Sequence, residues 1–208
     1  MIGAPRACLR QRQLDATREA IRVAAIDLVA DRGFSTVSVQ HISEAAGVSP
    51  RTFFNHFRSK DEALVPDIAD FTDQQRRTFL DATDVDLLTA LEHLLTDHVL
   101  GSLDLTGPGG ATCTAARLAQ TNLDLLPRML SVFEAFKHRV ADLVAQRTGT
   151  GPDDLSCVVT ADVALVTARA AIHRWSRDPE HLDLPTTLRD AYSALRDLAP
   201  AGSTPSPA

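Results

Sequence analysis

A segment of polar and aromatic residues between positions 43 and 60, SEAAGVSPRTFFNHFRSK, is the most informative part of the sequence. It predicts a helix that ends at Gly47, a short helix capped by Ser49, and a third helix that opens at Ser59-Lys60. The short helix carries small polar and aromatic side chains instead of a clean apolar stripe. Such a helix can pack on one face while the other meets phosphates and base edges. The segment therefore indicates a helix-turn-helix that contacts DNA.

The charge distribution supports this interpretation, although the whole chain of 208 residues has a net charge of −6. Residues 1–60 contain nine Lys or Arg against five Asp or Glu, and the remainder contains 12 against 22. A basic segment attracts DNA, and an acidic body discourages DNA from binding elsewhere.

The length suits one medium domain, or a small domain joined to a larger one. We see no apolar run of membrane-spanning length, and the Arg-rich first 14 residues lack the apolar core of a secretory signal. We therefore expect a cytoplasmic protein without a membrane partner.

The sequence contains no pattern typical of a metal, cofactor or catalytic site. Cys8, Cys113 and Cys157 are far apart and have no CxxC spacing, which disfavours a disulfide framework or zinc site. We expect Cys113 and Cys157 to be small buried residues, with redox sensing as the alternative. His93 and His98 are five residues apart and share no helix face. Without a nucleophile–base pair, carboxylate dyad or phosphate loop, we expect no enzyme and no cofactor.

Apolar residues recur with helical spacing along most of the chain, which predicts an all-α fold of about nine helices. One long helix is expected to open at Ser59, to tolerate Pro66 in an early turn, and to reach Phe79. Gly101–Gly110 is expected to be a loop. The predicted domains are a flexible basic arm over 1–13, a three-helix helix-turn-helix domain over 14–60, a helical domain over 61–199, and a disordered tail over 200–208.

Five short motifs follow one another between residues 17 and 64. They are Thr17-Arg18-Glu19-Ala20-Ile21, Gly33-Phe34, residues 42–49 (ISEAAGVS), residues 52–57 (TFFNHF) and residues 59–64 (SKDEAL). With them, residues 15–64 resemble the DNA-binding domain of the TetR family of bacterial regulators. An isolated Gly-Val-Ser would more often belong to a helical corner that only packs, but the combination of motifs disfavours that alternative. The remaining residues resemble the family only in helical layout.

The matched positions have a physical interpretation of their own. As N-caps, Ser38 and Ser49 leave helix N-terminal amides available to phosphate oxygens. Arg51, Thr52 and Asn55 are the polar side chains best placed for the major groove, and Arg51 could bind a guanine with two hydrogen bonds.

Further contacts follow from the resemblance. It implies that His56 and Lys60 bind phosphates. Pro50 follows the Ser49 cap at the first helical position and is included among the expected contacts. The family usually has Tyr where Phe54 stands, so we assign Phe54 to packing against a base methyl or a sugar. The arginines of the arm either enter a minor groove or belong to a disordered tail; they are Arg6, Arg10 and Arg12.

The resemblance also implies a helical domain that dimerises through its last two long helices. Residues 153–177 suit that role independently, because a helix that is apolar on nearly every side must be buried on every side. A central helix of a monomer is the alternative. The expected interface residues are Val159, Val163, Val166, Ala170, Leu188, Tyr192 and Leu195.

Members of the family enclose an effector pocket in this domain. Candidate lining residues lie on the expected inner faces, although a residue of this kind more often packs in the core than contacts a ligand. They are Phe71, Leu91, His98, Cys113, Met129, Phe133, Phe136 and Trp175.

These observations predict a ligand-responsive repressor. It would bind a pseudo-palindromic operator in double-stranded DNA as a homodimer, and a small, mainly hydrophobic effector would release it. The alternatives are an activator or a ligand-independent DNA-binding protein of the same fold and, more remotely, a helical carrier of small molecules.

Overall fold

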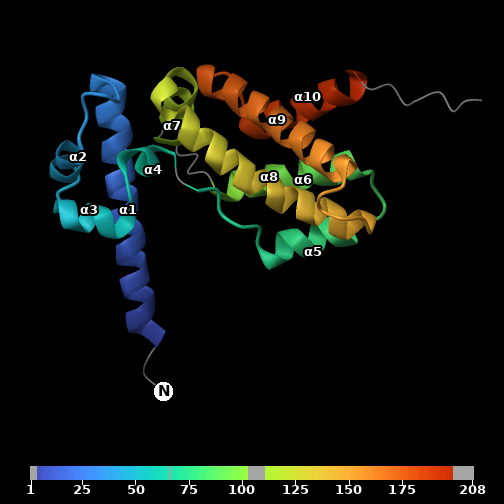
Figure 1. The fold of residues 1–208 in the computed structure, drawn as a ribbon, viewed down its shortest axis with the longest axis horizontal. Coiled ribbons are helices and arrows are strands. Elements are labelled where there is room, and N and C mark those ends of the chain that lie inside the picture. Colours follow the sequence, from blue (N-terminus) through green and yellow to red (C-terminus); the bar gives the residue numbers. More distant parts are fainter. Residues whose placement is uncertain (1–3, 66, 103–110, 199–208) are drawn as a thin grey trace, which may run out of the picture. The chain divides into compact units, whose positions relative to one another are not determined.

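The computed structural model describes residues 4–65, 67–102 and 111–198, and every regular element in these ranges is a helix (Figure 1). The all-α class is therefore confirmed. The elements are α1 (Ala4–Arg32), α2 (Val39–Ala45), α3 (Pro50–His56), α4 (Lys60–Leu64), α5 (Asp73–Asp81), α6 (Leu87–Ser102), α7 (Ala111–Thr121), the 3-10 helix η1 (Leu123–Leu125), α8 (Leu126–Thr148), α9 (Leu155–Arg177) and α10 (Leu184–Leu198).

The first helix is longer than expected. Residues 4–13 were predicted to be part of a flexible arm, but they form the first turns of α1. Their composition explains this result, because Ala, Leu, Arg and Gln favour helices and Pro5 stands in the first turn, where its missing N–H is harmless. Arg10 and Arg12 are exposed on this extension, whereas the side chain of Arg6 lies outside the described part.

The long helix expected from Ser59 to Phe79 is two helices. α4 ends at Leu64, and Val65 has φ −124° and ψ 81°, outside the helical region. Val65 precedes a proline, which disfavours the helical conformation of the residue before it. The helix restarts at α5, where the Thr72 hydroxyl accepts from the amide of Gln75 and the Gln75 side chain accepts from the amide of Thr72. This capping box provides a strong new start.

The chain divides into two compact units. The first unit consists of Met1–Ile68 and Gly109–Val132, and the second of Ala69–Pro108 and Phe133–Ala208. The first unit thus contains more of the chain than the predicted domain 14–60. Its fully buried core joins Ile21 and Ile26 of α1 to Leu125 of η1, so residues distant in sequence complete the core around the first three helices.

The second unit is a helical bundle held by a few specific contacts. The Tyr192 hydroxyl of α10 donates to the carbonyl of Ala164 in α9 at 2.8 Å. Arg196 of α10 pairs with the largely buried Glu92 of α6 at 2.8 Å. The guanidinium of Arg147 in α8 donates to three carbonyls around the end of α5 and the α5–α6 connection; they belong to Phe79, Ala82 and Val85.

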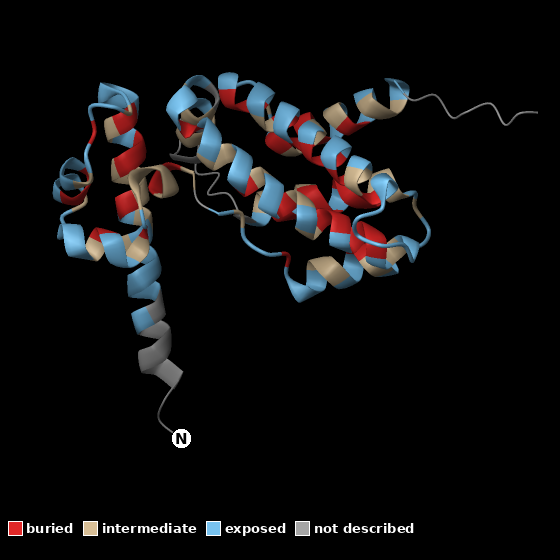
Figure 2. Cartoon of the chain, in the orientation of Figure 1, coloured by how far each residue is buried: buried red, intermediate tan, exposed pale blue. Residues whose placement is uncertain are grey.

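α9 corrects one sequence-based expectation. It is long and apolar enough to cross a membrane by length and composition, contrary to our prediction that no such run exists. A core helix of a soluble protein passes the same test. In this chain one face of α9 is buried against α10 and α6. Its other residues are exposed or half-buried, so buried and exposed residues are interspersed along the helix (Figure 2).

Two predicted irregular segments are only partly testable. Gly101 and Ser102 belong to the last turn of α6 instead of the expected loop. Residues 103–110 and the predicted tail over 200–208 lie outside the described residues.

Candidate nucleic-acid interface

Serine caps position the two short helices of the first unit as expected. The Ser38 hydroxyl accepts from the amide of His41 at 3.2 Å and begins α2. The Ser49 hydroxyl accepts from the amide of Thr52 at 3.0 Å and begins α3. Between them Gly47 has φ +67°, a left-handed conformation that glycine adopts without strain. The local sequence therefore specifies a helix, a sharp turn and a second helix.

α3 has one buried and one exposed face. Phe53 and Phe57, the C-cap residue of α3, are 0% and 1% exposed and fill the core. Arg51, Phe54 and Asn55 are exposed, and their spacing of three and four residues places them on one side of the helix. The exposed face carries cationic, aromatic and amide groups, which suit base edges in a major groove.

The remaining predicted contacts differ in exposure. Ser38, Ser49 and Pro50 are exposed at the helix starts, and Thr52 and His56 are half-buried. The Thr52 hydroxyl is 2.9 Å from that of Ser49.

Arg18 of α1 holds the end of α3, a role that sequence reasoning missed. Its Nη1 donates to the carbonyl of His56 at 2.9 Å, and its guanidinium lies over the Phe57 ring, 4.4 Å from the centroid. A cation at the C-terminal end of a helix satisfies an unpaired carbonyl and suits the helix dipole. Arg18 and His56 are 38 residues apart, so no local pattern could indicate the contact.

Lys60 has a different environment from the one expected of a phosphate ligand. Its Nζ donates to the carbonyls of Phe34 at 2.7 Å and Val37 at 2.9 Å, and it lies 4.0 Å from the centroid of the Phe34 ring. Two of the three ammonium hydrogens are therefore engaged within the protein. Lys60 therefore connects the start of α4 to the α1–α2 turn, and its contact with a phosphate stays a prediction.

We expect Lys60→Met to lower the free energy of unfolding by about 1–2 kcal/mol, because two carbonyls lose a charged donor. That change corresponds to a fall of about 2–8 °C in the melting temperature for a protein of this size. Thermal unfolding followed by circular dichroism measures it. Arg58→Met is the control, because Arg58 is an exposed cation two residues away. If both variants melt alike and both weaken DNA binding equally, Lys60 is a phosphate contact after all.

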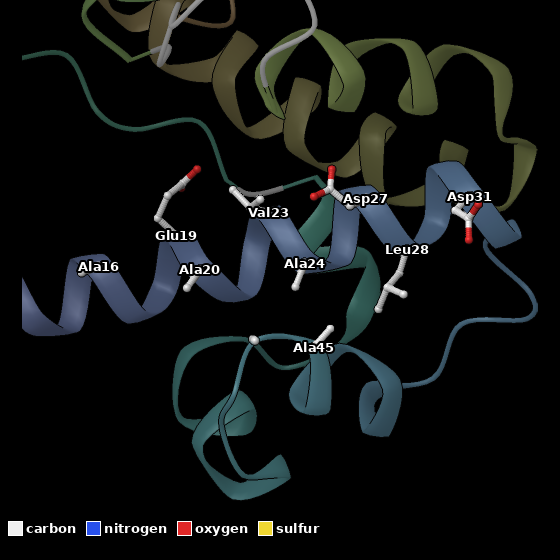
Figure 3. Close-up of a pocket in the computed structure, with 10 residues that line it drawn as sticks. Ala16, Glu19, Ala20, Val23, Ala24, Asp27, Leu28, Asp31 and Ala45 are labelled. Carbon is white, nitrogen blue, oxygen red and sulfur yellow. The ribbon is translucent and has the colours of Figure 1, made fainter.

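An open groove of about 800 Å³ lies along α1 and the end of α2 in the first unit (Figure 3). Ala20, Ala24 and Leu28 point toward Ala45, whereas Glu19 and Asp27 point away from it. Carboxylates along this groove repel phosphates.

The predicted effector-pocket residues are only partly brought together. Phe71, His98 and Phe136 form one aromatic cluster in the second unit, with ring centroids 4.8–5.2 Å apart. Burial lowers the pKa of His98 below its usual value, and the nearby Arg139 lowers it further while Asp70 opposes the shift. The shift favours the neutral form of the imidazole.

The other predicted pocket residues lie elsewhere. Leu91 and Trp175 are buried. Phe133 is half-buried, with the Arg169 guanidinium 5.7 Å from its ring centroid. Met129 belongs to the first unit, so it does not fall in the same compact unit as the cluster. The side chain of Cys113 lies outside the described part.

The predicted interface residues separate into two sets. Val159 (49% exposed), Val163 (38%) and Val166 (54%) form an exposed stripe on α9 with Ala170. Leu188 and Tyr192 are fully buried inside the chain and Leu195 is half-buried, because this face of α10 packs on α9. Leu188 and Tyr192 are therefore corrected from partner contacts to core residues.

The turn geometry and the exposed face of α3 define a DNA-binding protein of the helix-turn-helix class. Comparison with known proteins is consistent with this class. Residues 21–69 match the bacterial regulatory proteins of the tetR family, and residues 111–200 match the MftR C-terminal domain. The chain belongs to the TetR family of transcriptional regulators.

Individual relatives agree with this assignment. The regulator TcmR of Streptomyces glaucescens is 34% identical over 155 residues, which span 70% of this chain and 66% of TcmR. The putative mycofactocin biosynthesis regulator MftR of Mycobacterium tuberculosis is 28% identical over 193 residues, or 92% of this chain and 93% of MftR. The crystal structure of NalD, the secondary repressor of the MexAB-OprM efflux pump in Pseudomonas aeruginosa, has a TM-score of 0.56 at 21% identity and covers 88% of this chain and 96% of NalD. NalD supports the fold alone.

Proposed function

We propose that this regulator is a ligand-responsive repressor that binds a pseudo-palindromic operator as a homodimer. The exposed face of α3 is the observation that carries the DNA-binding part of this proposal. Arg51 would bind a guanine through two hydrogen bonds, Asn55 would contact a neighbouring base edge, and the helix starts at Ser38 and Ser49 would approach phosphates. The protein would act in the cytoplasm, and the proposal includes no catalysis.

The exposed stripe on α9 supports the homodimer. An apolar stripe of valines at helical spacing costs free energy in water, and a second copy related by two-fold symmetry would cover it with the same stripe. Two copies would present two α3 helices to the two half-sites of an operator.

The aromatic cluster of Phe71, His98 and Phe136 supports a small, mainly hydrophobic effector. An apolar ligand that displaces these rings would favour a different packing of the second unit. The ligand would then weaken DNA binding to the extent that it prefers that packing.

α8 is the element that we propose carries this change to the DNA-binding helices. Near its start, Arg128 donates to the carbonyl of Val65 at 3.0 Å and pairs with Asp67 at 3.0 Å, just after α4. Phe136 of the aromatic cluster belongs to the same helix. A shift of α8 at Phe136 would therefore move the residues that follow α4.

The test of DNA recognition is the Arg51→Ala variant, measured on duplexes that the wild-type protein selects from a randomised library. We expect affinity to fall by about 5- to 150-fold, and the base preference to disappear at one position of each half-site. Fluorescence anisotropy at several salt concentrations measures both effects.

The matched control is Arg77→Ala, which removes an exposed arginine on α5. It should leave affinity and sequence preference unchanged. Equal weakening of all sequences by Arg51→Ala would show a phosphate contact instead of base recognition. Transcription from a template with the selected site should fall when the protein is added, and a rise would identify an activator.

A further inference from the structure

One aromatic side chain on α3 is exposed, although the other two phenylalanines of the motif are buried. Phe54 is 55% exposed, whereas Phe53 and Phe57 are fully buried. The Phe53 and Phe54 rings meet edge to face, with centroids 5.5 Å apart and an interplanar angle of 85°. This is a favoured geometry for aromatic pairs, and it restrains the exposed ring. Phe54 therefore presents a preoriented apolar surface to solvent.

The position of this ring on the helix determines what it can meet. Phe54 lies one turn after Arg51 and next to Asn55, on the face that we assign to the major groove. Its ring has no hydroxyl and cannot donate a hydrogen bond to a phosphate. A ring between two base-contacting side chains is directed at base edges more than at the sugars of the backbone.

The major groove offers one apolar group on a base edge, the 5-methyl group of thymine. We propose that Phe54 is a specificity-determining residue that recognises the 5-methyl group of a thymine in each half-site. The inference rests on the proposed DNA-binding function and adds a defined base to it.

The helix geometry also predicts where this thymine lies. Three residues of an α-helix rise about 4.5 Å, and base pairs are stacked about 3.4 Å apart. The thymine is therefore one or two base pairs from the guanine that Arg51 binds.

The test uses the full-length protein and the duplexes that it selects from a randomised library. Each selected site should contain a preferred thymine in both half-sites. Replacing that thymine by deoxyuridine removes only the methyl group and keeps the base pair. We expect affinity to fall about fourfold per half-site, from the free energy of burying one methyl group, and about 15-fold when both half-sites are changed.

The Phe54→Ala variant links the effect to this side chain. Because it has lost the ring, it should bind the thymine and deoxyuridine duplexes equally, which a double-mutant comparison detects. Phe54→Tyr keeps the ring and should keep the discrimination. Circular dichroism verifies that both variants fold. If Phe54→Ala does not fold, Phe54→Leu replaces it. Leucine has a smaller apolar surface than phenylalanine, so this variant should discriminate less between the thymine and deoxyuridine duplexes.

Three results distinguish the inference from the proposed function. Selected sites without a preferred thymine would overturn the inference while leaving DNA recognition intact. Equal binding of both duplexes by the wild type, combined with weaker binding by Phe54→Ala, would assign the ring to a sugar and would also overturn it. A protein that selects no sequence at all would contradict the proposed function itself.

Discussion

The Val159→Glu, Val166→Glu double variant should be a monomer at concentrations where the wild type is a dimer. Both valines lie on the exposed stripe of α9. In a two-fold interface the variant would place four unpaired carboxylates in apolar surroundings. We expect a cost of at least about 4 kcal/mol, or about 1,000-fold in the dimer dissociation constant. Sedimentation velocity over a range of concentrations measures it.

Operator binding should weaken together with dimerisation. A monomer has one α3 helix and loses the second contact, which would reduce affinity by about 100-fold or more. Leu130→Glu is the control, because it places the same charge at another exposed leucine, on α8. A double variant that remains dimeric would show that the α9 stripe is not the interface.

Arg147→Met should produce a large loss of stability in the second unit. The half-buried guanidinium supplies donors to three backbone carbonyls around the α5–α6 connection, and it lies 5.1 Å from the centroid of the Phe79 ring. Methionine retains the apolar stem but leaves three partly buried acceptors without a donor. We expect a loss of about 3–4 kcal/mol in the free energy of unfolding, measured by urea denaturation.

Two further variants test the role of the guanidinium fork. Arg147→Lys keeps the charge, but a compact ammonium cannot span three carbonyls, so an intermediate loss is expected. Arg77→Met changes an exposed arginine and should alter stability by less than about 0.5 kcal/mol. A loss below about 1 kcal/mol for Arg147→Met would indicate that water replaces the guanidinium at these carbonyls.

The features predicted correctly are those encoded by neighbouring residues. The caps at Ser38, Ser49 and Ser59 each join a hydroxyl to an amide three residues later. The left-handed Gly47 and the burial of Phe53 follow from similarly short-range rules.

The errors also have identifiable causes. Apolar periodicity continued through Pro66, and we gave it more weight than the conformational restriction on the preceding Val65, which ends α4. The charge of residues 1–13 suggested a flexible arm, but their intrinsic helix propensity extends α1 to Ala4.

The sequence by itself determined most of the helical elements, the helix-turn-helix and the polar face of α3, because caps and helical periods act over three to seven residues. Only the tertiary structure decided that Lys60 and Arg18 brace these helices from within the protein. It likewise placed Leu188 and Tyr192 in the core while leaving the valines of α9 exposed. The partners in these contacts are separated by tens of residues, and their pairing depends on how whole helices pack, which no local pattern specifies.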